Sequence, residues 1–384
     1  MALMLRIEKL VHGGLGIARG PKGTVFVSGA VPGELVEVEV TGRRASTEFA
    51  RISRIVEPAA DRRTPFCPHA GVCGGCDWQH IRYERQVALK REILLECFRR
   101  QGKLERLPEI EVVSADEKAY RMRAQLKLDR QRSGVGFYER ATNTVAPIES
   151  CPLLVPELDR FVAGLRARLA SLPRDIEHVK AIAGTDGAVA SLPVIRGLSV
   201  AETAITVAGT EFRVSGDSFF QNNLFLVERL GQWPAERVGG QHCLDLYGGA
   251  GFFAAFVAPR FADVCLVEEV PSLVRLAGDT FRRHGLNHCR AVHATAERFL
   301  ASATGPLDCV IADPPRQGLD RAVVDGIRRL APQTLVYVSC DPATLARDVG
   351  LLVTPGAYTV AEVALFDLYP NTHHLESVVL MRRQ

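Results

Sequence analysis

The sequence predicts an α/β protein: an open, mostly parallel sheet with helices on both faces, preceded by two smaller β-rich units. Three observations support this fold class. Residues 216–384 alternate short apolar runs with helical patterns, residues 1–58 carry alternating runs between glycine and proline turns, and residues 59–215 are largely strand-like around a cysteine-rich loop. We therefore expect three domains, at residues 1–58, 59–215 and 216–384.

The composition is typical of a globular protein in a reducing compartment. With 384 residues and 47% hydrophobic content, the chain can bury a large core. No apolar run approaches the roughly 20 residues that span a bilayer, and the N-terminus lacks a signal-peptide pattern. We expect a soluble, cytoplasmic protein without a membrane partner. Its 10 cysteines then indicate metal binding or catalysis rather than a disulfide framework.

The first unit, residues 1–58, resembles a small barrel of the oligonucleotide-binding (OB) type. Positive charge is concentrated towards the front of the chain, with 25 basic and 19 acidic residues in 1–150 against 22 and 25 in the remainder. Arginines gather late in the unit, at Arg43, Arg44, Arg51 and Arg54. Such barrels hold nucleic-acid backbones with basic side chains, so we expect an RNA-binding domain. The alternative is a structural barrel with ordinary surface charge.

The second unit opens with closely spaced cysteines in a loop rich in proline and glycine. Cys67, Cys73 and Cys76 follow a C-x5-C-x2-C spacing, and Cys151 is the best candidate for a fourth ligand. Four thiolates suit either an iron–sulfur cluster or structural zinc, and the spacing does not separate the two. After the loop, residues 83–103 have the apolar periodicity of an amphipathic helix, which we expect to pack against the last domain.

The last domain carries seven apolar runs that read as strands, with helical patterns between the first six. Their alternation predicts a parallel sheet covered on both faces, and the last two, close together, predict an antiparallel edge. The expected strands are 243–247, 264–267, 290–293, 309–312, 335–339, 360–366 and 377–381.

A cofactor site is predicted where the first strands of this domain end. Tyr247 is followed by the glycine-rich turn Gly248–Gly251, which includes Gly249 and lets a ligand approach the backbone. Glu268 ends the second strand, 17 residues after Gly251, where an acidic side chain can accept ribose hydroxyls. Because the turn lacks the full dinucleotide spacing, S-adenosylmethionine fits better than a nicotinamide dinucleotide. Asp313 ends the fourth strand before two prolines that stiffen the loop.

Cys340 follows a buried strand and precedes a turn and a helix that begins near Thr344. A thiol at a strand tip facing a helix N-terminus is placed to act as a nucleophile, because the helix dipole favours the thiolate. An inert buried cysteine is the alternative.

Together these residues resemble the RNA 5-methyluridine (uracil-C5) methyltransferase family, over nearly the whole chain. The resemblance implies an N-terminal TRAM domain in residues 1–58 and a [4Fe-4S] cluster held by the four cysteines above. It also implies S-adenosylmethionine (SAM) contacts at Gln221 in an F-x-Q-x-N element, and at Tyr247, Glu268 and Asp313. Cys340 matches the nucleophile, and Glu376, which ends a D-x-F-P-x-T-x-H-x-E segment, matches the general base.

The resemblance implies that Cys340 adds to uracil C6 and that Glu376 later removes the C5 proton. His373 and His374 either orient the substrate or cap the loop. We expect RNA as partner, with ribosomal RNA favoured over transfer RNA, and nothing implies an obligate protein partner. An alternative of another class is a non-catalytic RNA-binding or chaperone protein, although binding alone needs no nucleophile.

Overall fold

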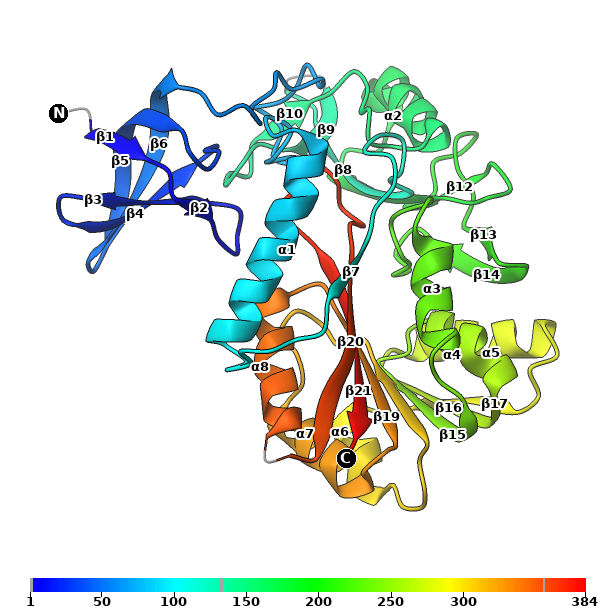
Figure 1. Cartoon of the computed structure of the whole chain (residues 1–384). Coiled ribbons are helices and arrows are strands. Elements are labelled where there is room, and N and C mark those ends of the chain that lie inside the picture. Colours follow the sequence, from blue (N-terminus) through cyan, green and yellow to red (C-terminus); the bar gives the residue numbers. More distant parts are fainter. Residues whose placement is uncertain (1–2, 132–133, 355) are drawn as a thin grey trace.

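The computed structural model describes residues 3–131, 134–354 and 356–384, and Figure 1 shows their arrangement. The N-terminal domain is a six-stranded sheet of order β1-β5-β6-β4-β3-β2 with its own apolar core, into which Val25, Val27, Val36 and Val38 point. Its strands are β1 (Leu3–Arg6), β2 (Lys9–Leu10), β3 (Gly16–Gly20), β4 (Gly23–Ser28), β5 (Leu35–Arg44) and β6 (Thr47–Glu57).

Most of the arginines predicted to form a basic patch on this domain are paired with glutamates on the neighbouring strand. Arg51 lies 2.7 Å from Glu39, Arg54 lies 3.0 Å from Glu37, and Arg43 contacts Glu48. Cross-strand pairing of this kind follows from the register of β5 and β6, which the sequence alone does not reveal. The charge available to a polyanion on this face is therefore smaller than the arginine count suggests.

The central unit contains a five-stranded antiparallel sheet of order β10-β9-β8-β11-β12, covered by the apolar stripe of α2, and a separate hairpin. Its elements are β8 (Arg123–Asp129), β9 (Gly134–Tyr138), β10 (Val145–Pro147), α2 (Pro156–Arg168), β11 (His178–Ala183), β12 (Val189–Leu192), β13 (Glu202–Val207) and β14 (Thr210–Ser215).

The large sheet of the last domain has eight strands, in the order β17-β16-β15-β18-β19-β21-β20-β7. The first five are parallel, and β21 runs antiparallel to both its neighbours. The elements are α3 (Val227–Ala235), β15 (Gly240–Leu246), α4 (Phe252–Val257), β16 (Phe261–Glu268), α5 (Pro271–Arg283), β17 (Cys289–His293), α6 (Ala296–Ser302), β18 (Cys309–Ala312), α7 (Arg321–Leu330), β19 (Thr334–Ser339), α8 (Pro342–Val353), β20 (Tyr358–Phe366) and β21 (Glu376–Arg383).

The expected antiparallel pair is present, but it does not form the edge of the sheet. The edge strand is β7 (Ile110–Val113), a segment expected within the central unit, which pairs in parallel with Val363–Phe366 of β20. A four-residue strand that pairs with residues some 250 positions away leaves no local signal in the sequence. The large sheet is therefore completed by chain from the first half of the protein.

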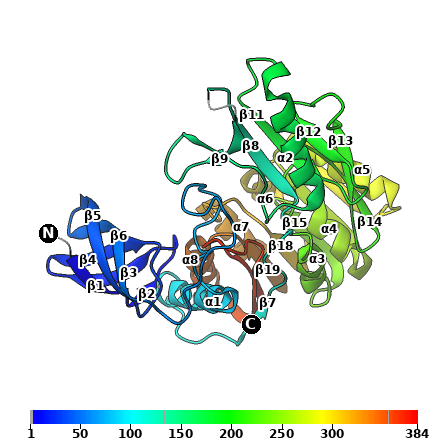
Figure 2. The same cartoon turned by 90° about the horizontal axis from the view of Figure 1, so that it is seen from above.

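Helix α1 (Tyr83–Arg100) also comes from the first half of the chain and packs against the last domain, beside α8 (Figures 1 and 2). Its buried Leu94 and Phe98 share an apolar core with Leu345 and Val349 of α8. The approach is close just beyond the helix end, where a Cβ on Gly102 would lie 2.7 Å from the Ala346 carbonyl oxygen. Within the described ranges, neither α1 nor another helix combines the length and apolar character needed to cross a membrane.

Candidate active site

One edge of the large sheet collects the predicted site residues around a cavity of about 490 Å³. Parallel strands meet with their carboxyl ends at the same edge. Tyr247, Glu268, Asp313 and Cys340 stand at or just after the ends of β15, β16, β18 and β19. Glu376 reaches the same edge because β21 is antiparallel to β19, with Ser377 paired to Ser339. These five residues line the cavity, together with Gln221 and Gly249.

The glycine turn and Glu268 line the side of the cavity where the sequence predicts the cofactor. The Glu268 carboxylate accepts hydrogen bonds from the backbone N–H of Gly249 at 3.0 Å and of Val270 at 2.8 Å. Gly248 is required by close packing, because a Cβ there would lie 2.4 Å from Leu266 Cγ. Gly251 starts α4 with φ of +89°, a conformation that glycine adopts without strain. A nucleoside can therefore lie directly against this backbone.

Gln221 is placed by its neighbours in the 218–223 segment. The Asn222 side chain accepts from the Arg123 N–H at 2.8 Å. The buried Asn223 side chain donates to the Leu368 carbonyl at 3.2 Å and accepts from the N–H groups of Phe225 and Leu226. These bonds tie the Gln221 loop to β8 on one side and to the segment before Glu376 on the other.

The surroundings of Cys340 favour the protonated thiol. Burial raises its pKa to about 11, and the Glu376 carboxylate adds to the shift. Arg316 acts in the opposite direction, through its charge and a hydrogen bond to the thiol. Arg316 is therefore the side chain best placed to favour the thiolate.

Two carboxyl groups, those of Asp313 and Glu376, line the same cavity. Burial raises the pKa of Asp313 to about 7. Burial, and then the proximity of Asp313, raise the pKa of Glu376 well above its usual range, with Arg316 opposing. Both carboxyls thus hold protons more tightly than exposed carboxyls do, and raised pKa values of this kind are common in sites of proton transfer.

The adjacent histidines have different places. His374 lines the main cavity, and burial followed by the charge of His373 lowers its pKa to about 4, so its imidazole is neutral. The backbone N–H and ring of His373 bind Asp77, the residue after Cys76. Only His374 therefore lines the main cavity.

Sequence reasoning missed Tyr369 and Asp245. Tyr369 lines the cavity where the resembled motif has phenylalanine, and its ring packs edge-on to His374 at 6.0 Å. Asp245, within β15, is fully buried behind the glycine turn; its Oδ1 has no partner, and burial raises its pKa to about 8. Its place inside an apolar strand was the available signal, because an acidic residue there is rare without a function.

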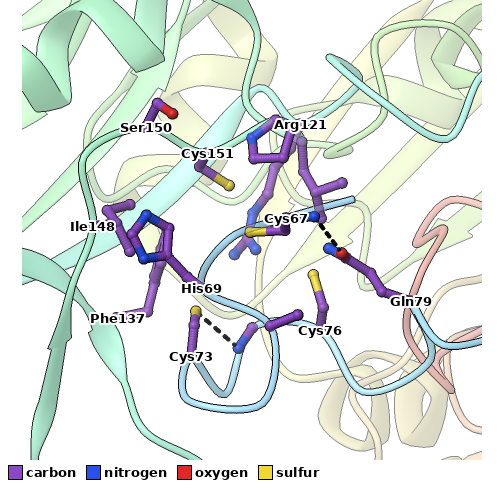
Figure 3. A pocket seen from close by; sticks show the side chains of 14 residues that line it. Cys67, His69, Cys73, Cys76, Gln79, Arg121, Phe137, Ile148, Ser150 and Cys151 are labelled. Carbon is purple, nitrogen blue, oxygen red and sulfur yellow. Dashed lines mark hydrogen bonds between the residues drawn. The ribbon is translucent and has the colours of Figure 1, made fainter. Parts of the chain in front are cut away.

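The four predicted cysteine ligands line one small cavity of about 20 Å³ (Figure 3). His69, Arg121 and Phe137 are among the other side chains that line it. Burial raises the pKa of Cys73, of Cys151 and of Cys76, the last to about 12. Within the described ranges, no three His, Cys, Asp or Glu side chains are grouped closely enough to count as a formed metal site.

The cysteine loop is joined directly to the segment that carries Glu376. The N–H groups of Asp77 and Trp78 donate to the Asn371 carbonyl at 3.2 and 3.0 Å. Gln86 and Arg63 bind the Asn371 side chain, and Tyr120 donates to the Pro370 carbonyl at 3.0 Å. The geometry of the catalytic segment therefore depends on the central unit.

Comparison with known proteins identifies the family. A family model described as tRNA (Uracil-5-)-methyltransferase matches residues 196–384. The 23S rRNA (uracil(1939)-C(5))-methyltransferase RlmD of Chromohalobacter salexigens is 37% identical over 432 aligned positions, covering 99% of this chain and 89% of the relative. The protein of the same name from Alkalilimnicola ehrlichii is 33% identical, with 99% and 96% coverage. This chain belongs to the RNA uracil-C5 methyltransferase family.

A solved structure supports the fold of this family member. The Pyrococcus abyssi tRNA (uracil-54, C5)-methyltransferase, in complex with S-adenosyl-L-homocysteine, superposes with a TM-score of 0.78 and covers 99% of this chain and 100% of that one. At 22% identity the match concerns the fold, which is that of a SAM-dependent methyltransferase with a mixed sheet. The expected fold of the last domain is thereby confirmed, and the 37% and 33% identical relatives confirm the family.

Proposed function

We propose that this chain transfers a methyl group from SAM to C5 of a uridine in ribosomal RNA, forming 5-methyluridine. The observation that carries the proposal is that the nucleophile, base and cofactor candidates of the family motifs line one cavity. Its volume of about 490 Å³ is in the range of small-molecule sites. The 37% and 33% identical relatives are named for this reaction on 23S rRNA.

In this proposal, the target uracil lies flipped out of its stack between Cys340 and Glu376. The Cys340 thiolate, favoured by Arg316, forms a bond from Sγ to C6, and the C5=C6 electron pair becomes an enolate over C5 and O4. When bound, SAM supplies an electrophilic methyl group and a positive charge beside the two carboxyls. C5 takes the methyl group from the sulfonium sulfur of SAM, which leaves as the neutral thioether; Glu376 then removes the C5 proton, the C5=C6 double bond re-forms, and the Cys340 thiolate leaves C6.

We assign the cofactor side to Gln221, Tyr247, Gly249, Glu268 and Asp313. Glu268 already accepts two backbone hydrogen bonds, so its carboxylate is oriented at the mouth of the turn. Carboxylate oxygens in that position accept ribose hydroxyls. Asp313 lies at the reacting end, where its raised pKa makes it responsive to the cationic charge of the ligand.

We further propose that Cys67, Cys73, Cys76 and Cys151 hold a [4Fe-4S] cluster with a structural role. The donor set fits, because four thiols and no carboxylate line the cavity, and the one lining imidazole, His69, already accepts a hydrogen bond from the Glu149 N–H. The hydrogen bonds from Asp77 and Trp78 to Asn371 supply a structural purpose. We expect about four iron atoms and four acid-labile sulfides per chain, and no zinc. Changing the oxidation state of the cluster should leave the methyltransferase activity unchanged. Zinc in place of iron would contradict the assignment, and Cys151→Ser should lose the metal.

The N-terminal domain is assigned as the TRAM-type RNA-binding domain. Its six-stranded sheet and separate core suit an OB-like barrel, although only part of its arginine set is free of glutamate partners. Transfer RNA is the second candidate substrate, favoured by the descriptions of the family model and of the archaeal structure.

Methyl transfer to unmodified RNA, fractionated into ribosomal and transfer RNA, tests the proposal. We expect 5-methyluridine in the ribosomal fraction with the wild type and none with Cys340→Ala. Product in the transfer RNA fraction alone would replace the substrate assignment. RNA binding without product, from protein that binds SAM, would favour the non-catalytic alternative.

A further inference from the structure

A hairpin loop of the N-terminal domain reaches the loops that carry the nucleophile. The β2–β3 loop is closed by hydrogen bonds from Gly14 N–H to the Val11 carbonyl, at 2.9 Å, and from Val11 N–H to the Leu15 carbonyl, at 3.0 Å. Figure 2 shows this domain beside α1 and α8. The Trp78 indole donates to the Gly14 carbonyl at 3.3 Å, which joins the hairpin to the cysteine loop.

His12, in this hairpin, lies against the residue that follows the nucleophile. Its Nε2 is 3.3 Å from Asp341 Oδ2. The other oxygen of Asp341 accepts from the N–H groups of Ala343 and Thr344 at 3.0 and 2.9 Å and so caps α8. Although burial alone would raise it, hydrogen bonds from His12 and Thr344 lower the pKa of Asp341 to about 2. The carboxylate therefore links the hairpin to the turn that presents Cys340.

The hairpin also contributes His12 to the lining of a second cavity beside Cys340. This cavity, of about 90 Å³, is lined by His12 together with Cys340, Arg316 and His374. The last three residues also line the main cavity. Cys340 thus lies between two cavities, and the smaller is bounded by the N-terminal domain.

The contact is close enough to require glycine. Gly14 has φ of +79°, and a Cβ there would lie 2.7 Å from His373 Cβ. Gly13 has φ of +89°, but its Cβ position faces open space, with nothing within 4 Å. Replacing either glycine with alanine would therefore strain the backbone at a positive φ. Only the Cβ at position 14 would also collide with His373.

We propose that His12 and Gly14 form a wall of the active site and that His12 is a positioning residue for Cys340. Methyl transfer would then depend on the specific contact between His12 and Asp341, in addition to RNA binding by the N-terminal domain. The proposal rests on the function proposed above for Cys340. A domain that only recruits RNA would affect KM for RNA and leave kcat and the thiol unchanged.

The first test compares His12→Ala and His12→Gln with Lys9→Ala. Lys9 lies in the same domain and pairs with Glu96 of α1 at 2.9 Å, so its loss removes a different interdomain contact and leaves the His12–Asp341 contact in place. We expect His12→Ala to lower kcat at saturating RNA about tenfold or more, since misplaced reacting groups lose rate steeply. His12→Gln, which keeps a donor near Asp341, should recover much of this loss, and Lys9→Ala should keep wild-type kcat.

A second readout needs neither RNA nor SAM. The rate of Cys340 alkylation by iodoacetamide, followed on its own peptide by mass spectrometry, should rise at least about threefold in His12→Ala, because the small cavity opens to solvent. SAM binding measured by calorimetry should stay at the wild-type value, which excludes unfolding. Gly14→Ala and Gly13→Ala form a matched pair for the same readouts. Only Gly14→Ala should reproduce the lower kcat and the faster Cys340 alkylation of His12→Ala.

A change confined to KM in His12→Ala, or no change in kcat and alkylation, would overturn the proposal. The same holds if Lys9→Ala or Gly13→Ala reproduces the defect, because docking or backbone strain would then explain it. If the wild type transferred no methyl group to RNA, the proposed function would fail, and the alkylation comparison would still decide whether the hairpin positions Cys340.

Discussion

Replacing Lys90 tests how the segment that carries Glu376 is held in place. Lys90 of α1 and Asp367, just after β20, form an ion pair of 2.5 Å in which both side chains are fully buried. Lys90 also donates to the Tyr369 carbonyl at 3.0 Å. Because a helix from the first half of the chain anchors this segment, Lys90→Met should loosen it and reduce methyl transfer.

The magnitude follows from the burial of the pair. Removing the lysine leaves a carboxylate in an apolar site, where its Oδ2 already lacks a partner. Breaking a buried ion pair costs about 3–5 kcal/mol, and the lost hydrogen bond to the Tyr369 carbonyl adds about 1 kcal/mol. Replacing both partners, in Lys90→Met/Asp367→Leu, removes the stranded charge and should bring the local stability back to within about 2 kcal/mol of the wild type.

Native-state hydrogen exchange, read on peptides covering residues 366–376, measures this local stability without requiring two-state unfolding of the whole protein. We expect the backbone amides of this segment to exchange at least about 100-fold faster in Lys90→Met, which corresponds to about 3 kcal/mol. The double variant should exchange at nearly the wild-type rate. Unchanged exchange in the single variant, or a double variant as labile as the single one, would refute the reasoning.

Two further predictions concern titration. Because burial raises the pKa of the Cys340 thiol to about 11, its alkylation in the ligand-free protein should accelerate with pH up to about pH 10, and Arg316→Gln should slow it at each pH; a plateau below pH 9 would contradict this. Burial raises the pKa of Asp245 to about 8, so the folded state keeps a proton that the unfolded state loses above about pH 4. Stability from this group therefore falls between pH 4 and 8, and Asp245→Asn should gain thermal stability over the wild type at pH 8 but not at pH 4; an equal difference at both would sink the assignment.

Local patterns in the sequence were sufficient to predict the strands of the last domain. Each of the seven expected strands is present within a few residues of its predicted bounds, because apolar runs between helical patterns report on a doubly covered sheet. Because parallel strands end at the same edge of a sheet, the strand pattern alone predicts that Glu268, Asp313 and Cys340 lie together there. Gln221 and Glu376 came from motif resemblance, and the structure places them in the same cavity.

What the sequence did not reveal are partnerships between distant segments. Neither the pairing of β7 with β20, the Lys90–Asp367 pair nor the His12–Asp341 contact has a local signature, since each depends on the packing of separate domains. The arginine count of β5 and β6 overestimated the positive charge available to RNA for a related reason. Their glutamate partners lie on the neighbouring strand, and the sequence does not show this pairing. The place of Tyr369 in the cavity was not predicted, because the motif has phenylalanine at this position and gives a tyrosine there no separate role.

The central claim is that Cys340 and Glu376 act on one uracil, as nucleophile and base. Glu376→Gln tests it most directly, since the C5 proton could no longer be removed and the thiolate could not leave. Incubated with SAM and ribosomal RNA, this variant should accumulate a covalent adduct that survives a denaturing gel, and the Cys340→Ala/Glu376→Gln double variant should form none. A folded Glu376→Gln variant that binds SAM and yields no adduct, or one that turns over at the wild-type rate, would contradict the account.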